Sequence, residues 1–335
     1  MTPAAISLAI LRFAVWELAL FAAAVRIAEW LGWSKPERPE EKWLAVLALQ
    51  VTLESSFAAL FSFTGMNSAA AYWIVAAICL LTLLGRPVRR LSLPPDSLHA
   101  ALIASLLTPL VLLAFKPIQE IDSINYLHYL IDWMANRATP YTFATNYVAF
   151  WELSFLPAWM LTGVDLFFPL LALKAVLLLG LAAWLVGREL GVPRDLLIWT
   201  IFGSLVMRHY WFEYSGVPTL KNDALHGVGF VLLTLVVLRA AQRSLGPTDI
   251  ALLAFGAAFA SVKYTGIFVA VLVVSLLIVL PYSRPRVGLA PQKLAWLAAA
   301  AFFLLTSGHY YLHNLIRYGS PFYPFQINIA FIHLP

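Results

Sequence analysis

The sequence predicts an all-α, polytopic bundle of transmembrane helices, and three observations carry that prediction. Hydrophobic residues make up 61% of the 335-residue chain and charged residues only 12%, whereas soluble globular proteins average about 45–50% and about 25%. The apolar residues fall in runs close to the roughly 20 residues that a membrane-spanning helix needs. Lysine and arginine gather in alternate connections between these runs. Both soluble domains and nucleic-acid binding are excluded by this pattern.

About ten apolar runs are expected to span the membrane, and turn residues separate them. In chain order, the expected spans are 5–33, 43–63, 69–84, 98–115, 166–187, 196–210, 224–238, 250–262, 264–280 and 294–311. The aromatic stretch 148–161 contains Glu152 and Pro157. It is therefore interpreted as an interfacial helix within the first large outer loop.

The break between 250–262 and 264–280 is inferred from charge. One continuous helix would place the basic connections on either side of it at opposite faces of the membrane, whereas two helices keep them on one face. Lys263 then lies in the turn. Because the first of the two helices is short, Lys263 is expected in a recess below the lipid headgroups.

The distribution of basic residues predicts the orientation of the chain. Cytoplasmic loops of membrane proteins carry an excess of lysine and arginine. Five alternate connections hold most of the 22 basic residues: Lys35, Arg38, Lys42, Arg86, Arg89, Arg90, Arg188, Arg194, Arg239, Arg243, Arg284, Arg286 and Lys293. These connections are expected in the cytoplasm. The outer face then collects most of the histidines and several carboxylates, which is typical of a functional site.

Two carboxylates, Glu120 and Asp122, lie close together in the first long outer segment, residues 116–147. A carboxylate just beyond a spanning helix can accept the proton of a hydroxyl nucleophile at the bilayer surface. The alternative is that both are solvated loop residues, or that Asp122 caps a following helix.

Three further clusters lie on the same face, at 221–223, 261–266 and 309–324. Lys221 can pair with a lipid phosphate, and Lys263 lies at a helical break. The alternatives are helix capping in the first cluster and snorkelling of the lysine in the second. In the third cluster, the aromatic and proline content fits an interfacial belt.

His309 and His313 of the third cluster are four residues apart and share a helix face. A metal pair is an alternative, although no carboxylate follows at ligand spacing. Arg317 follows them and can bind phosphate in a fork geometry.

In these clusters the sequence resembles the GT-C superfamily of integral-membrane glycosyltransferases, which use polyprenyl-phosphate-linked sugars. The resemblance covers roughly 98–325. It rests on the acidic segment 120–122, the aromatic-proline stretch 150–159, the clusters 221–223 and 263–266, and the ending 314–324. That ending looks like N-x-x-x-Y-G-N-P-x-Y-P, with Ser320 in place of the second asparagine.

The resemblance implies a sugar transfer at the outer face of a bacterial inner membrane, onto a glycan, lipid or protein acceptor. It implies that Asp122 is the catalytic loop carboxylate, which acts as the base or orients the acceptor, with Glu120 as the alternative. The expected donor-phosphate ligands are Lys221, Lys263 and Arg317. The expected supporting residues are Asp223, His226, His313 and Tyr264. The use of a divalent metal stays open, since schemes with and without a metal fit one or two acids.

Two features depart from the family's pattern. A three-helix segment, residues 1–97, precedes the expected catalytic core, residues 98–335, and the chain ends in an outer loop, so the core is expected to be incomplete. A transporter or lipid flippase is the alternative function, in which Glu54, Lys174 and Lys263 line a path. A non-catalytic membrane scaffold is a third reading.

Overall fold

The described part of the chain is helical apart from one short hairpin. The computed structural model describes residues 2–30, 39–82, 121–142, 147–211, 221–279, 290–324, 327–329 and 332–334. The hairpin pairs β1 (Ile327–Ile329) with β2 (Ile332–Leu334) in antiparallel register. The helical fold class predicted from the sequence is confirmed for these residues.

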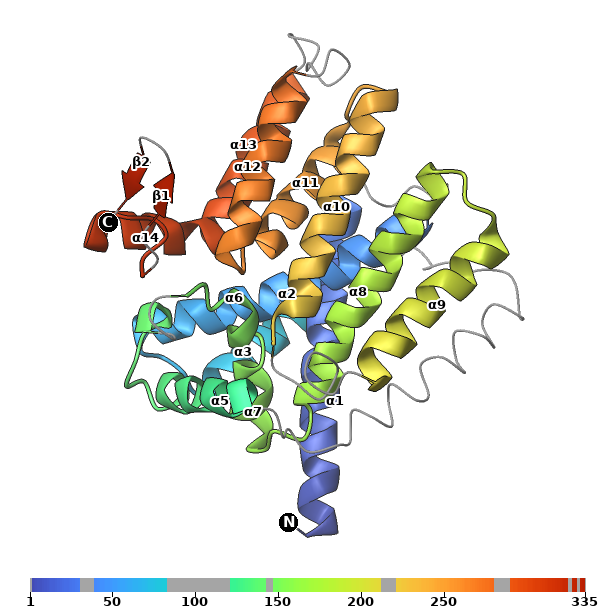
Figure 1. Ribbon diagram of the computed structural model, residues 1–335. Helices are drawn as coiled ribbons and strands as arrows, with labels where there is room; N and C mark the ends of the chain where they lie inside the picture. The colour runs from blue at the N-terminus through green and yellow to red at the C-terminus, as the bar shows by residue number, and fades with distance from the viewer. Residues whose placement is uncertain are drawn as a thin grey trace.

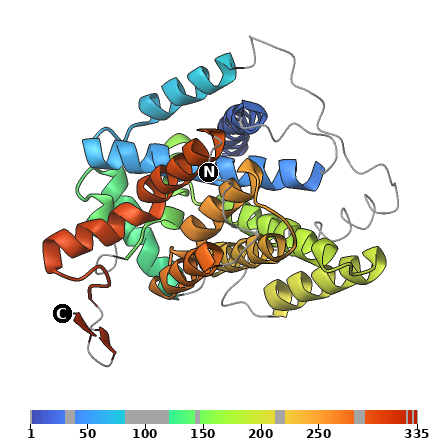
Figure 2. The same ribbon diagram turned by 90° about the horizontal axis from the view of Figure 1, so that it is seen from above.

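Four helices are long and apolar enough to cross a membrane, which indicates an integral membrane protein. These are α1 (Pro3–Trp30), α2 (Pro39–Thr64), α8 (Phe168–Glu189) and α10 (Asp223–Gln242). In Figure 1, α8 and α10 run side by side. In Figure 2, α1 is seen end-on while α2 lies lengthwise, so the two long N-terminal helices cross each other.

The expected break before Tyr264 is confirmed: α11 (Pro247–Ala260) and α12 (Tyr264–Val279) are separate helices joined by a tight turn. Glycine makes this turn possible. A Cβ on Gly266 would lie 1.8 Å from the backbone oxygen of Ala260, and one on Gly229 of α10 would lie 2.1 Å from the Ala260 nitrogen. Only glycine lets the three backbones approach so closely.

Four expected spans, 5–33, 43–63, 166–187 and 224–238, correspond to the four long helices, and ten spans are not confirmed. Within 69–84 the structure describes α3 (Ala69–Leu81), whose 13 residues extend about 20 Å at 1.5 Å per residue. The expected 196–210 lies in α9 (Arg194–Trp211), a helix of 18 residues with closely similar bounds. A π-helical turn, η2 (Leu304–Gly308), interrupts 294–311 between α13 (Ala290–Phe303) and α14 (His309–Tyr318). The expected span 98–115 lies outside the described residues.

The expected interfacial helix at 148–161 is instead two short helices, α6 (Phe150–Leu153) and α7 (Leu156–Thr162). Residues 148–158 are all buried, and Glu152 is one of them. The aromatic residues of this stretch pack into the core rather than against lipid headgroups. Helix α5 (Ile121–Met134) packs against both α6 and α7, and η1 (Pro140–Thr142) contacts α2.

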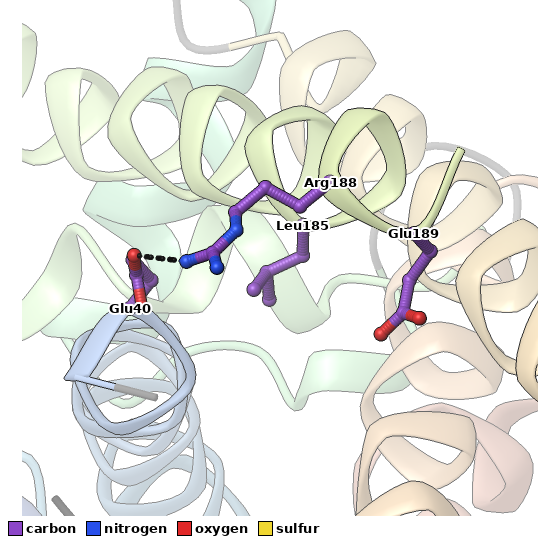
Figure 3. Close-up of a pocket in the computed structure, with 4 residues that line it drawn as sticks. All are labelled: Glu40, Leu185, Arg188 and Glu189. Atoms are coloured by element: carbon purple, nitrogen blue, oxygen red, sulfur yellow. Dashed lines mark hydrogen bonds and ion pairs between the residues drawn. The ribbon is translucent and has the colours of Figure 1, made fainter. Parts of the chain in front are cut away.

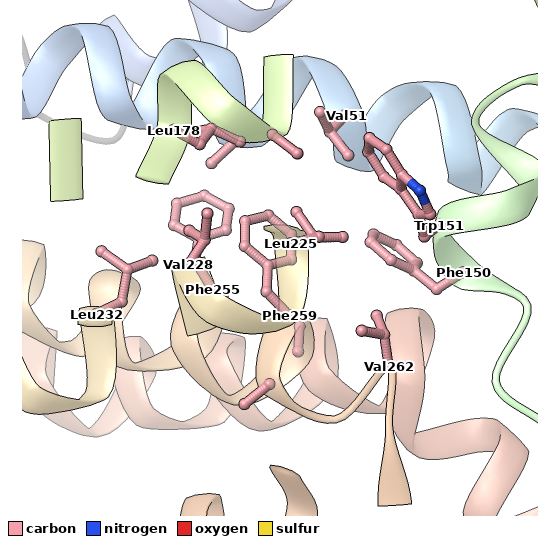
Figure 4. Packing of buried hydrophobic residues seen from close by; sticks show 14 of the residues in the cluster. Val51, Phe150, Trp151, Leu178, Leu225, Val228, Leu232, Phe255, Phe259 and Val262 are labelled. Atoms are coloured by element: carbon pink, nitrogen blue, oxygen red, sulfur yellow. The ribbon is translucent and has the colours of Figure 1, made fainter. Parts of the chain in front are cut away.

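Aromatic and aliphatic side chains from several helices meet in one continuous core (Figure 4). Phe150 of α6 lies against Phe259 of α11, with ring centroids 6.1 Å apart, and Leu225 of α10 is fully buried beside them. This cluster includes residues from α1 and α2 as well as α14. Both expected segments, 1–97 and 98–335, contribute to this core. The division between them stays a prediction.

Candidate functional site

Helix α10 carries polar groups at both of its ends. Asp223 at its start contacts the turn between α11 and α12, and we call this region the Lys263 end. Arg239 in its last turn contacts the starts of α2 and α11 and the end of α8, and we call this region the Arg239 end. The connections that the sequence marks as basic after α8 and α10 lie at the Arg239 end.

At the Lys263 end, Lys263 Nζ forms an ion pair with Asp223 Oδ1. The two side chains are 39% and 27% exposed. Asp223 opens α10, and Lys263 lies in the turn between α11 and α12, so the pair joins two of the clusters seen in the sequence. Lys221, two residues before Asp223, is half-buried. Because the Lys263 side chain is 39% exposed, an anionic ligand can still reach it.

A buried carboxyl group, Glu152 of α6, lies behind this pair. Asn222 Nδ2 donates to Glu152 Oε1 over 3.3 Å and to the Val262 carbonyl over 3.5 Å. Glu152 is 1% exposed, and its Oε2 has no hydrogen-bond partner among the described residues. Burial raises the pKa of Glu152 to about 8, although the positive charge of Lys263 acts in the opposite direction.

The ending that resembles the family motif packs against the same turn. Asn314 Nδ2 donates to the Tyr264 hydroxyl over 3.2 Å, and that hydroxyl donates to the Tyr323 carbonyl over 2.7 Å. The Tyr311 hydroxyl donates to the Ser261 carbonyl over 2.7 Å. Tyr264 is therefore held in place by the segment 314–324, and three of the sequence clusters meet in one region.

His226, expected as a supporting residue, links α10 to the turn. Its Nδ1 lies 2.6 Å from the Ala260 carbonyl, which can only accept, so Nδ1 carries the proton. Its Nε2 lies 3.4 Å from the Thr265 hydroxyl. These contacts fix the position of the backbone around Lys263.

His313 and Arg317 lie on α14. His313 stacks on Tyr141, with ring centroids 3.8 Å apart, and the Tyr141 hydroxyl lies 3.2 Å from His309 Nδ1. Partial burial and the nearby charge of Arg317 lower the pKa of His313. Arg317 is exposed in the last turn of α14. The two histidines thus contact an aromatic residue, and no group of three possible metal ligands occurs among the described residues.

The two expected catalytic acids are not placed by the structure. Glu120 lies outside the described residues, and so does the side chain of Asp122, whose backbone belongs to the first turn of α5. Helix α5 packs against α6, which carries Glu152. The prediction that Asp122 and the lysines share one site therefore stays untested.

Sequence reasoning missed the charge network at the Arg239 end. Arg239 is 1% exposed and forms ion pairs with Glu41, Glu189 and Asp249. Arg243 also pairs with Asp249, over 2.7 Å. Four helices are thereby tied together: α2, α8, α10 and α11. The sequence did contain a signal for this network: the carboxylates Glu41, Glu189 and Asp249 lie in or beside the connections that are rich in lysine and arginine.

A pocket of about 70 Å³ lies beside this network (Figure 3). It is lined by Glu40, Leu185, Arg188 and Glu189, and Arg188 Nη1 donates to Glu40 Oε1 over 3.0 Å. The pocket lies at the opposite end of α8 and α10 from Lys263, so it is separate from the candidate site.

Searches against protein-family models, characterised proteins and solved structures find no match for this chain.

Proposed function

We propose that this protein is a membrane glycosyltransferase of the GT-C type. In this proposal it moves a sugar from a polyprenyl-phosphate donor to a glycan, lipid or protein acceptor. One observation carries it: the accessible Lys263–Asp223 pair lies at the end of membrane-spanning helix α10, where the segments 221–223, 261–266 and 314–324 meet. A lipid-linked anionic donor would present its phosphate at such a position.

The proposed chemistry needs a base and a cationic site. An acceptor hydroxyl attacks the anomeric carbon of the sugar, the bond from that carbon to the phosphate oxygen breaks, and the hydroxyl proton passes to a carboxylate. Asp122 is the proposed base, with Glu120 as the alternative. Lys263, together with Lys221 and Arg317, would neutralise the charge that develops on the leaving phosphate.

Asp223 has a supporting role in this scheme. Its carboxylate pairs with the Lys263 ammonium and holds it at the end of α10. His226 and Tyr264 fix the backbone and the ring next to it, and His313 contributes to the aromatic surface on α14.

The orientation is part of the proposal: a bacterial inner membrane with the Lys263 end outward. The excess of lysine and arginine in the connections at the Arg239 end supports it. Single cysteines introduced in the 243–246 turn and in the exposed part of α14 can be labelled in intact cells with an impermeant thiol reagent. Labelling of the 243–246 turn and not of α14 would overturn the orientation.

The direct test of function uses the full chain in liposomes with a radiolabelled polyprenyl-phosphate sugar. Asp122→Asn and Lys263→Gln should each strongly lower transfer, while Arg188→Gln at the opposite end should not. Full turnover by Asp122→Asn at normal expression would remove Asp122 from the mechanism. Absence of both donor binding and transfer in the wild-type protein, across a panel of lipid-linked sugars, would overturn the function itself.

A transporter or flippase is the second candidate, and a different observation favours it. Lys174 of α8 pairs with Glu17 and Glu54 inside helices long enough to span the membrane, and charged groups at that depth often line transport paths. Uptake or lipid scrambling by the protein in liposomes, without any sugar transfer, would support this candidate over the first.

A further inference from the structure

A charged network joins three of the long apolar helices. Lys174 of α8 contacts Glu17 Oε2 of α1 over 2.5 Å and also contacts Glu54 Oε1 of α2. Gln50 Nε2 donates to the same Glu17 oxygen over 2.7 Å. Glu54 is 1% exposed, and the side chain of Lys174 is 11% exposed. The network is therefore largely closed to solvent.

The network contains two carboxyl groups and one ammonium group. Glu17 and Lys174 are the charged groups that act on Glu54, and the two carboxyls are those that act on Lys174. Arg12, on the same helix as Glu17, donates instead to the Leu161 carbonyl. With every group ionised, the described network would carry one uncompensated negative charge at membrane depth, and such a charge is costly.

The two carboxyl groups lie next to each other, because Lys174 Nζ contacts one oxygen of each. Two ionised carboxylates that share one site repel each other, and a proton held by one of them removes that repulsion. In addition, Glu17 Oε1 is buried and has no hydrogen-bond partner among the described residues. It is an acceptor that a further proton or cation can occupy.

We propose that Glu17, Glu54 and Lys174 form a binding site for one proton inside the membrane. The bound proton, shared by the two carboxyls, makes the network neutral and allows α1, α2 and α8 to pack together. This inference does not rest on the glycosyltransferase proposal, because the network lies apart from the Lys263–Asp223 pair.

Infrared difference spectroscopy of the full chain in liposomes tests the proposal, because a protonated carboxyl has a carbonyl stretch distinct from that of a carboxylate. The experiment uses Glu152→Gln as its parent, so that the buried carboxyl group of Glu152 does not contribute. At neutral pH, the parent should show the band of a buried carboxylic acid. Adding either Glu17→Gln or Glu54→Gln should abolish that band, because one carboxylate then faces one ammonium.

Lys174→Gln should instead strengthen the band, since both carboxyls then need a proton. Size-exclusion profiles identify variants that do not fold. If a variant does not fold, the proposal is tested instead by raising the pH of the parent protein: the carboxylic acid band should disappear, and sodium should not affect this change. A band that is absent from the parent, or that survives both glutamate substitutions, would overturn the proposal. A band that appears only after sodium is replaced by choline would overturn it in favour of a metal cation.

Discussion

Lys263 and Asp223 are 40 residues apart in the chain and form an ion pair at the start of α10. The pair depends on the turn between α11 and α12, which turns the chain back so that Lys263 faces the end of α10. Both side chains are partly exposed. Exposed ion pairs contribute little to stability, about 0–1 kcal/mol, so an anionic ligand can compete with Asp223 for Lys263.

Replacing Lys263 should therefore affect activity more than folding. We expect Lys263→Gln to lower transfer from a polyprenyl-phosphate sugar by about 100- to 1000-fold, the usual loss when one group that stabilises transition-state charge is removed. Lys263→Arg keeps the charge and should retain part of the activity. The measurement is turnover in liposomes at matched protein amounts.

Arg188→Gln provides the matched control, because Arg188 is 54% exposed and lies at the Arg239 end. It should keep wild-type turnover. Equal loss in both variants would mean that a general change of surface charge, and not the Lys263 site, lowers activity.

Arg239 should be important for stability. It is 1% exposed and faces three carboxylates, so Arg239→Met leaves buried acids without their partner. Breaking a buried pair in this way costs about 3–5 kcal/mol. The thermal unfolding midpoint in detergent should fall sharply. Arg243→Gln, whose side chain is 45% exposed, should cost about 1 kcal/mol or less; similar losses for the two would contradict a central role of Arg239.

Some of this arrangement follows from the sequence alone. Charge placement predicts the break before Tyr264, because a single helix would have put two basic connections on opposite faces. The order of the polar clusters predicts that 221–223 and 261–266 meet, since both lie at the same ends of neighbouring helices.

The rest depends on contacts between distant segments. Hydropathy marks 148–161 as aromatic and interrupted, but it cannot tell an interfacial helix from one covered by other helices. Glu152 is buried because α2 packs against α6 and because Asn222, at the start of α10, contacts its carboxyl group. Similarly, Lys174 stands out as the one charge within the apolar run 166–187, whereas Glu17 shares its run with Arg12 and Arg26. Their pairing appears only when α1 crosses α2 beside α8.

Gly229 should tolerate no side chain. A Cβ there would lie 2.1 Å from the backbone nitrogen of Ala260, so α10 and α11 would have to separate, at a cost of about 1–3 kcal/mol. Gly203 of α9 is the control, because a Cβ at that position has no neighbour within 4 Å. Gly203→Ala should stabilise the helix by about 0.5–1 kcal/mol. Thermal unfolding distinguishes the two, and equal midpoints would contradict the close approach of the helices.

The pH dependence of stability should report on Glu152. Burial raises its pKa from the usual 4.5 to about 8, so between these values the folded chain holds a proton that the unfolded chain has released. Stability from this group is complete below about pH 4.5 and is lost as pH rises to about 8. Unfolding midpoints of the wild-type chain should fall across this interval.

Glu152→Gln removes the titration while keeping the hydrogen bond from Asn222, since an amide oxygen can also accept. Its midpoint should therefore fall less than that of the wild type between pH 4.5 and about 8. Asp132→Asn, which changes an exposed carboxylate paired with Arg137, should keep the wild-type slope. If the Glu152→Gln and wild-type slopes coincide, Glu152 is ionised throughout, and the buried carboxyl must have a counter-charge beyond Lys263.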